Sequence, residues 1–294
     1  MNLGRILTAM VTPMNSALEV DFSASEDLAR YLLEHGSDGI VVCGTTGESP
    51  TVTADEKIEL FTRVKKAVGE RGTEVANVGT NSTEASIALA TRAEQTKVDA
   101  IMAVVPYYNK PSQEGLYQHF KAIAESTSLP VILYNVPSRT AGNMLPATVK
   151  RLAEIPNIVA IKEASGSMDQ VSELKRILPA DFLVYSGDDA STLPMLALGC
   201  SGIISVAAHV VGDEMKKMIE AWFAGDSATA TKWHLHLYPM FKGIFMTTNP
   251  VPIKAMVNMI GLNAGGVRLP LVEANEEEKK YLTALITQIK ENSL

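Results

Sequence analysis

Eight short apolar runs, rich in β-branched residues, recur between Ile6 and Ala207 and limit the folds open to this chain. Each run is almost continuously apolar, which is typical of strands that are covered on both faces, as in a parallel sheet. The predicted strands are Ile6–Pro13, Gly39–Gly44, Glu74–Gly79, Ala100–Pro106, Val131–Val136, Ile158–Glu163, Phe182–Gly187 and Gly202–Ala207.

Segments with helical periodicity separate these runs. The first begins at Ser23 with Glu26 three residues later, a pattern typical of a helix start. The predicted helices are Ser23–His35, Ala54–Val68, Thr83–Gln95, Ser112–Ser126, Pro146–Glu154, Met168–Leu178 and Thr192–Leu198. Eight strands that alternate with helices predict a (β/α)8 TIM barrel. An open doubly wound sheet is the alternative, but no Gly-x-Gly-x-x-Gly turn follows the first strand.

The strand signal stops after Ala207. The remaining segments have only helical periodicity, and they are Asp213–Ala224, Ser227–Lys242, Pro252–Met259 and Ala274–Asn292. We therefore expect a barrel over residues 1–224 and a helical C-terminal extension over residues 225–294.

Composition excludes several classes of partner and location. A net charge of −7 over 294 residues disfavours binding to nucleic acid or to an anionic membrane. The two cysteines, Cys43 and Cys200, are too few for a disulfide framework and suit a reducing compartment. The start of the chain lacks the pattern of a signal peptide, and no apolar run approaches the roughly 20 residues needed to span a bilayer. A cytoplasmic enzyme without membrane contacts is expected.

Polar side chains gather where the predicted strands end, which is where barrels of this kind carry their active sites. Lys162 ends the sixth run, and strict alternation places it on the same face as Ile158 and Ala160. A lysine that loses its hydration has a lowered pKa, and the neutral amine can attack a ketone to form a Schiff base. The alternative is a lysine that extends to water or pairs with a carboxylate.

The second strand ends in Gly44-Thr45-Thr46-Gly47-Glu48, a turn whose N–H groups and threonine hydroxyls can bind an anion. A plain turn that caps the next helix is the alternative. Glycine-rich loops do not follow both of the last two strands, where barrels commonly hold phosphate, so a carboxylate substrate is favoured.

Two further strand ends supply candidate side chains. Tyr134 can pass protons at an imine, or it is a core tyrosine. Arg139 can clamp a carboxylate, or it is a surface arginine. The adjacent Tyr107 and Tyr108 favour an interface, with packing on the barrel rim as the alternative.

Other polar residues are interpreted as structural. The histidines His119, His209, His234 and His236 lack metal-ligand spacing. Asp188 and Asp189 have no third ligand near them in the sequence, so a loop or helix cap is expected. No metal site is predicted.

Taken together, these motifs resemble the dihydrodipicolinate synthase family of pyruvate-dependent class I aldolases, which also contains N-acetylneuraminate lyase. The resemblance runs from Gly4 to about Pro270. It rests on Gly44–Ser49, Pro106–Pro111, Tyr134–Thr140, Ile161–Gly166, Ser186–Asp189 and Asn249–Lys254.

The resemblance implies that Lys162 condenses with pyruvate and that the resulting enamine attacks L-aspartate 4-semialdehyde to give 4-hydroxy-tetrahydrodipicolinate, toward diaminopimelate and lysine. It matches Tyr134, Thr46 and Tyr108 to the proton-relay triad of the family. It implies that Tyr108 is contributed by the neighbouring subunit of a dimer, and two such dimers often form a homotetramer. It further implies that Thr45 and Thr46 hold the pyruvate carboxylate and that Arg139 holds the semialdehyde carboxylate. Main-chain groups of Gly187 and Ile204 are implied near the lysine, and no cofactor is needed.

Three alternatives within and beyond this family stay open at this point. N-acetylneuraminate lyases usually carry Gly-Ser-Thr-Gly-Glu, where this chain has Thr45, and they lack an arginine matching Arg139. Keto-deoxy sugar acid aldolases of the same family are held as an alternative. A non-catalytic barrel is the alternative from another class. Members inhibited by lysine often carry histidines where this chain has Ala54 and Lys57, and a glutamate where it has Ala85. We therefore expect lysine feedback to be weak or absent.

Overall fold

The computed structural model describes residues 3–291. Two predictions therefore fall partly outside the described residues: the one about the start of the chain, at Met1 and Asn2, and the end of the last helix at Asn292. Eight parallel strands pair in sequence order and the last pairs with the first, which closes the barrel and excludes the open sheet. The strands are β1 (Ile6–Ala9), β2 (Gly39–Val42), β3 (Thr73–Asn77), β4 (Ala100–Val104), β5 (Val131–Asn135), β6 (Ile158–Glu163), β7 (Leu183–Ser186) and β8 (Gly202–Ser205).

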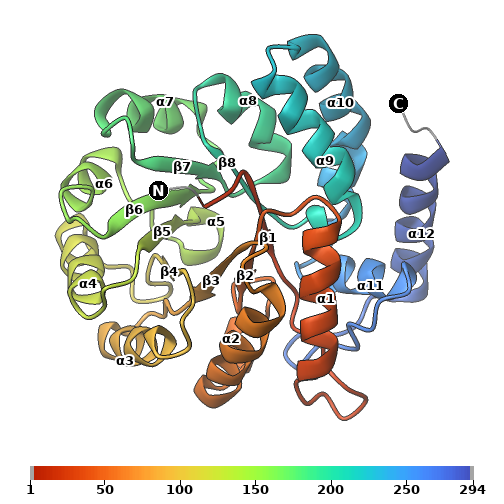
Figure 1. Ribbon diagram of the computed structural model, residues 1–294, viewed down its shortest axis with the longest axis horizontal. Coiled ribbons are helices and arrows are strands. Elements are labelled where there is room, and N and C mark those ends of the chain that lie inside the picture. Colours follow the sequence, from red (N-terminus) through yellow and green to blue (C-terminus); the bar gives the residue numbers. More distant parts are fainter. Residues whose placement is uncertain (1–2, 292–294) are drawn as a thin grey trace.

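Helices surround the strands in a ring, as Figure 1 shows. They are α1 (Phe22–Glu34), α2 (Ala54–Val68), α3 (Thr83–Glu94), α4 (Gln113–Glu125), α5 (Pro137–Thr140), α6 (Pro146–Leu152), α7 (Met168–Ile177), α8 (Thr192–Ala197) and α9 (Ala208–Phe223). Three further helices follow, α10 (Ser227–Gly243), α11 (Val251–Met259) and α12 (Glu276–Glu291), and two 3-10 turns are η1 (Ser49–Thr51) and η2 (Asp189–Ser191). The predicted (β/α)8 barrel with C-terminal helices is confirmed.

Strand alternation divides the core into two layers. Inward side chains such as Leu7, Val41 and Ile132 form one buried cluster inside the barrel, and the outward set packs against the helices in a larger cluster. The N-terminal segment closes one end of the barrel, because Leu3 joins the inner cluster and the Tyr185 hydroxyl donates to the Gly4 carbonyl over 2.8 Å. A packed interior leaves the carboxyl ends of the strands as the place for a site.

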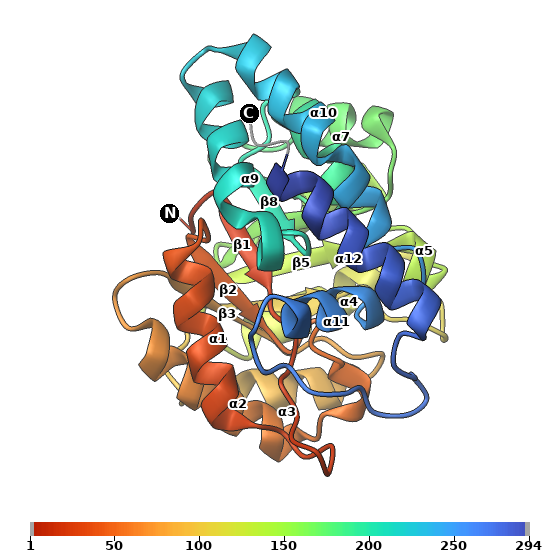
Figure 2. The same cartoon turned by 90° about the vertical axis from the view of Figure 1, so that its right-hand side faces the viewer.

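The three last helices lie together on one side of the ring in Figure 1, and Figure 2 shows that side from the front. A buried ion pair attaches this extension to the barrel: Lys254 Nζ of α11 lies 2.7 Å from Glu48 Oε1, and both side chains are almost fully buried. The Glu48 Oε2 atom also accepts from the Arg268 backbone N–H at 2.9 Å. The extension is therefore anchored directly beside the Gly44–Glu48 turn. A boundary at residue 224 stays a prediction.

Some predicted boundaries were wrong for identifiable reasons. The first predicted strand runs to Pro13, but β1 ends at Ala9. The Met10 N–H makes a last bond to the Val41 carbonyl of β2, and the N–H of the buried Val11 donates to His209 Nε2 instead of to a strand. Helix α1 begins earlier than predicted, since Asp21 rather than Ser23 caps it by accepting from the Ala24 N–H. Helix α9 begins at Ala208 instead of Asp213, and its backbone is non-helical at Val211, so the periodic segment starts only after this kink.

The strict alternation expected along the sixth strand is also wrong at its start. The pairing of β5 with β6 shifts between Val131 and Ile132, whose partners are Ile158 and Ala160. One extra residue in β6 at this bulge turns Ile158 outward into the helix-facing cluster. Ala160 remains in the inner cluster, on the face that Lys162 continues.

Candidate active site

Lys162 lies near the end of β6 with only 5% of its surface exposed. Its Nζ is 4.4 Å from the centre of the Tyr134 ring, which comes from the neighbouring strand β5. The loop after β7 approaches from the other side: a Cβ added at Gly187 would lie 3.2 Å from the Lys162 Cε and 2.7 Å from the Ala164 Cβ. A residue without a side chain is therefore required at Gly187, next to the predicted reactive amine.

The surroundings of Lys162 lower its pKa from 10.5 to about 8. Burial is the largest cause, the Asp189 carboxylate opposes it, and the Arg139 guanidinium adds to it. Asp189 is itself buried, which raises its pKa to about 6. The position of Asp189 is fixed by the Ser205 hydroxyl and by the N–H groups of Val206 and Ala207. The amine thus carries a substantial neutral fraction near neutral pH, as a Schiff-base lysine needs.

Tyr134 is buried, and burial raises the pKa of its phenol, while Arg139 and a hydrogen bond with Thr45 partly offset the rise. The phenol therefore stays protonated at neutral pH. Thr45 is thus the threonine whose interaction with this phenol lowers its pKa, whereas the sequence interpretation placed Thr46 in the relay. The Thr46 hydroxyl accepts from Asn249 Nδ2 at 3.0 Å. Both threonines line the Lys162 cavity.

One cavity of about 270 Å³ brings the central predicted residues together. Thr45, Thr46, Tyr134, Arg139, Lys162 and Gly187 all line it, together with Ser138, Ala164, Asp188, Val206, Asn249 and residues of α10. Ile204 is not in this lining and lies in the inner barrel cluster. The cavity combines a buried amine, two hydroxyl donors, a phenol and a guanidinium, a set that can bind a keto acid and transfer protons to it.

Arg139 reaches this cavity from a helix that the sequence did not predict. Helix α5 is a single turn from Pro137 to Thr140. It ends where the next residue, Ala141, adopts the left-handed backbone conformation. The Arg139 Nη2 atom lies 3.5 Å from the Asn249 carbonyl, a long contact that leaves most of its donors free. A free guanidinium at this position can bind a second carboxylate in a bidentate manner.

The two adjacent tyrosines separate in the structure. Tyr107 lines a second cavity together with Thr45, Tyr134 and Arg139. Tyr108 is 90% exposed and has a φ of 72°, a conformation that is strained for a bulky aromatic residue. Tyr108 is not among the residues that line the Lys162 cavity of the chain.

Sequence reasoning missed the residues that support the site. The contacts of Asn249, Asp189 and Lys254 join segments that are far apart in the sequence, so local patterns do not predict them. Asn249 and Lys254 do belong to the motif Asn249–Lys254, which was noted in the sequence without a role for either residue. The side chain of Asn249 is buried, and its Oδ1 has no hydrogen-bond partner among the described residues.

Asp188 and His209 have structural contacts, as interpreted, whereas Asp189, for which a loop or helix cap was also expected, acts on the Lys162 pKa. Asp188 caps η2 through the N–H groups of Ala190 and Ser191. The buried His209 accepts from the Val11 N–H and bonds the Val206 carbonyl, and burial lowers its pKa to about 4. Within residues 3–291, no group of three His, Cys, Asp or Glu side chains is arranged to hold a metal ion. No helix in that range is both long and apolar enough to cross a bilayer.

The fold and the site define a class, the (β/α)8-barrel enzymes with a reactive lysine on a barrel strand. Within that class, residues 2–289 match the model of the Dihydrodipicolinate synthetase family. The chain belongs to this family.

Relatives support the assignment over nearly the whole length. The chain is 59% identical over 288 residues to the 4-hydroxy-tetrahydrodipicolinate synthase of Moorella thermoacetica, covering 98% of this chain and 99% of the relative. It is 58% identical over 287 residues to the same enzyme of Desulforudis audaxviator, with 98% of each chain covered.

Solved structures agree in fold. The dihydrodipicolinate synthase of Bacillus anthracis superimposes with a TM-score of 0.96 at 49% identity, covering 98% of both chains. The enzyme of Cyanidioschyzon merolae, solved with lysine bound, also gives a TM-score of 0.96, at 43% identity and with 98% of both chains covered.

Proposed function

We propose that this chain is a lyase that condenses pyruvate with L-aspartate 4-semialdehyde to form 4-hydroxy-tetrahydrodipicolinate. The observation that carries the proposal is the Lys162 amine, which is buried in the cavity against Tyr134 and has a pKa lowered to about 8. The close relatives that bear the name of this synthase favour it over the sialic acid lyase and the keto-deoxy sugar acid aldolase.

The chemistry begins at the neutral amine. Lys162 adds to the keto carbon of pyruvate, and the resulting carbinolamine loses water to give an imine. Loss of a proton from the methyl carbon then gives an enamine, whose carbon attacks the aldehyde carbon of the second substrate while the aldehyde oxygen gains a proton. The amine of the second substrate finally displaces Lys162 from the imine carbon, which closes the ring and frees the enzyme.

Side chains of the cavity take the supporting roles. We assign the proton relay to Tyr134 and Thr45, because Thr45 lines the Lys162 cavity with Tyr134 and acts on the pKa of its phenol, in place of the expected Thr46, whose hydroxyl accepts from Asn249. Thr46 stays assigned to the pyruvate carboxylate beside Thr45. Arg139 binds the carboxylate of the semialdehyde, because its donors are largely free at the cavity. Main-chain groups of Gly187 and Ile204 remain a proposal for the pocket of the amine.

A homo-oligomer completes the relay in this proposal. Tyr108 is exposed and strained, and its own Lys162 cavity lacks its phenol. A second copy of the chain therefore supplies it, in a dimer and in a tetramer of two dimers. Mixing Lys162→Ala subunits with Tyr108→Phe subunits tests this arrangement, since a hybrid dimer contains one site with both native groups. Activity that does not rise on mixing contradicts a shared site. A cytoplasmic location stays a prediction.

Borohydride trapping tests the central step. Reduction in the presence of pyruvate adds one reduced pyruvate to the mass of the chain, and peptide mapping locates the adduct on Lys162. The Lys162→Ala variant gives no adduct, and its thermal melt checks that it is folded. Assays with L-aspartate 4-semialdehyde, N-acetylneuraminate and a 2-keto-3-deoxy sugar acid then identify the substrate. An unmodified native chain contradicts the imine, and turnover of the sugar acids alone contradicts the assigned substrate.

A further inference from the structure

The strands β5 and β6 each end in two polar residues, and the proposed reaction uses only the first of each. On β6, Lys162 lines the cavity, and Glu163, one residue later, points outward to the surrounding helices. On β5, Tyr134 belongs to the cluster inside the barrel, and Asn135, one residue later, points outward. The strand register pairs Tyr134 with Lys162 and then Asn135 with Glu163. A second pair of polar side chains, almost fully buried, therefore lies directly behind the pair that the reaction uses.

The Glu163 carboxylate joins three segments of the chain. Its Oε2 accepts from Asn135 Nδ2 and from Gln170 Nε2 of α7, each at 3.1 Å. Its Oε1 accepts from the Ser165 N–H at 2.6 Å. A buried carboxylate depends on such donors because it has lost its contact with water, and hydrogen bonds to a charged group are about twice as strong as those between neutral groups. These bonds therefore fix the end of β6 relative to β5 and α7.

The main chain of the same two residues holds the wall of the cavity. The Glu163 carbonyl accepts from the Gly187 N–H at 2.8 Å, and the Asn135 carbonyl accepts from the Ala164 N–H at 2.9 Å. Both Gly187 and Ala164 line the cavity that contains the Lys162 amine. A displacement of Glu163 or Asn135 would therefore move the cavity wall together with the amine.

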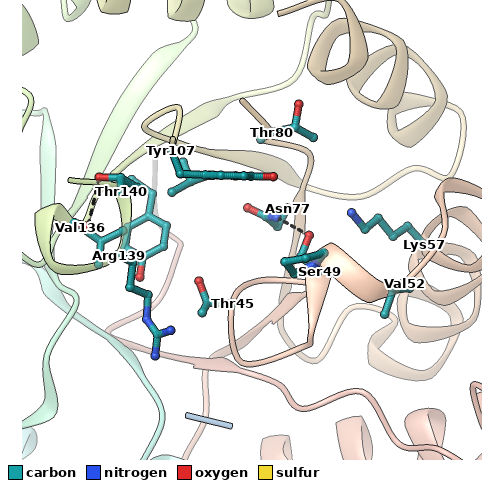
Figure 3. A pocket seen from close by; sticks show the side chains of 14 residues that line it. Thr45, Ser49, Val52, Lys57, Asn77, Thr80, Tyr107, Val136, Arg139 and Thr140 are labelled. Carbon is teal, nitrogen blue, oxygen red and sulfur yellow. Dashed lines mark hydrogen bonds between the residues drawn. The ribbon is translucent and has the colours of Figure 1, made fainter. Parts of the chain in front are cut away.

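Asn135 also supports the segment that carries Arg139. Its Oδ1 accepts from the Met144 N–H at 3.0 Å, so it holds the chain on the far side of helix α5. The helix itself is closed by the Thr140 hydroxyl, which donates to the Val136 carbonyl at 3.2 Å. Figure 3 shows this bond, with the Arg139 side chain leaving the same turn.

We propose that Glu163 and Asn135 are positioning residues, which act through the main chain to hold the Lys162 amine against Tyr134. The proposal rests on the proposed function, because the two positioned groups are those that form and protonate the imine. The amine lies 4.4 Å from the centre of the Tyr134 ring, and a misplacement of about 1 Å can slow a reaction about a hundredfold. Hydrogen bonds suit this support because each one fixes a direction as well as a distance.

Rapid-quench borohydride trapping with pyruvate, between pH 6 and 10, tests the proposal as a rate per folded chain. Glu163→Gln keeps the shape of the side chain but leaves one acceptor oxygen for three donors. We expect the rate plateau at high pH to fall about tenfold or more, while the midpoint of the pH profile stays native. On the plateau the Lys162 amine, whose pKa is about 8, is already neutral, so the loss reports geometry. A native plateau, or a shifted midpoint with an unchanged plateau, overturns the proposal.

Asn157→Ala is the matched control, because Asn157 precedes the opposite end of β6. Its amide donates to the carbonyls of Ala124, Thr127 and Leu129, at 2.9, 3.1 and 3.2 Å. This variant should lower the thermal melt and leave the plateau rate unchanged. Equal losses of rate in Asn157→Ala and Glu163→Gln would show that Glu163 contributes only stability.

A charge swap provides the rescue. Asn135→Asp alone places two carboxylates side by side, whereas Asn135→Asp combined with Glu163→Gln restores one carboxylate and one amide. The double variant should therefore form the imine faster than Asn135→Asp, and a double variant that is no faster contradicts the proposal. Where Glu163→Gln does not fold, Gln170→Met replaces it, because it removes only one donor from the carboxylate. Its plateau should fall by less, and a native plateau then counts against the positioning role.

Trapping on the native chain separates the two possible failures. A native chain that forms no imine contradicts the proposed function. A native chain that forms the imine, together with a Glu163→Gln variant that forms it equally fast, contradicts the positioning role alone.

Discussion

The pH at which Lys162 becomes reactive is the most direct quantitative consequence of its burial. With a pKa of about 8, about 9% of the amine is neutral at pH 7, against about 0.03% for an amine at 10.5, a ratio of about 300-fold. The initial rate of imine formation should therefore rise tenfold per pH unit below pH 8 and level off above it. Borohydride quenching at short times, between pH 6 and 10, followed by mass measurement gives this rate.

Asp189 provides the perturbation that tests the cause. Its carboxylate raises the Lys162 pKa against the effect of burial, and with its own pKa at about 6 it is ionised at the midpoint. Asp189→Asn removes that charge, so the midpoint for imine formation should move to lower pH. Asp188→Asn is the matched control, because Asp188 caps η2 and is not among the groups that shift the Lys162 pKa. A native midpoint near 10, or an upward shift in Asp189→Asn, refutes the reasoning.

Three further outcomes follow from individual contacts. Thr45→Val should lower kcat about tenfold or more, because it removes the hydroxyl that interacts with Tyr134. Thr46→Val should act mainly on KM for pyruvate. Steady-state kinetics that show the reverse pattern contradict the assignment. Glu74 is buried, and its oxygens have no hydrogen-bond partner among the described residues, so its pKa is raised well above 4.5. The protonated carboxyl therefore stabilises the folded chain at low pH, and this stabilisation is lost as pH rises through the raised pKa. Glu74→Gln should therefore raise the free energy of unfolding by about 1 kcal/mol or more at pH 8 and by less at pH 4, as urea titrations measure, and an equal effect at both pH values argues against it. Millimolar lysine should inhibit weakly or not at all in initial-rate assays, because the buried Lys57 cation repels a cationic ligand; potent inhibition shows this to be wrong.

Local patterns predicted most of the fold because each of them reports burial on one element. The apolar runs mark strands that are covered on both faces, and helix α2 was predicted with its observed bounds, Ala54–Val68, since a capping box begins it and Gly69 follows it. Patterns failed where burial and pairing separate. Met10 and Val11 are buried beyond the end of β1, where the Val11 N–H donates to His209 Nε2 and not to a neighbouring strand. The bulge in β6 turns Ile158 outward without any change in apolar character.

The site divides in the same way. Lys162, Tyr134 and Arg139 could be selected from the sequence because reactive side chains at strand ends converge in any barrel of this kind. The partner of each group could not, since hydrogen bonds depend on the direction of a side chain within a turn. Thr45 and Thr46 are adjacent and chemically identical, yet Thr45 acts on the pKa of Tyr134, while the Thr46 hydroxyl accepts from Asn249.

The sequence by itself determined the barrel, its order of strands and the amine at its mouth, because periodicity and strand ends are properties of neighbouring residues. Only the tertiary structure decided the pKa of that amine and the contact of Asn249 with Thr46 across 203 positions of sequence. These depend on which distant charges and hydrogen-bonding groups the closed ring brings within a few ångströms, and on how completely it excludes water from them.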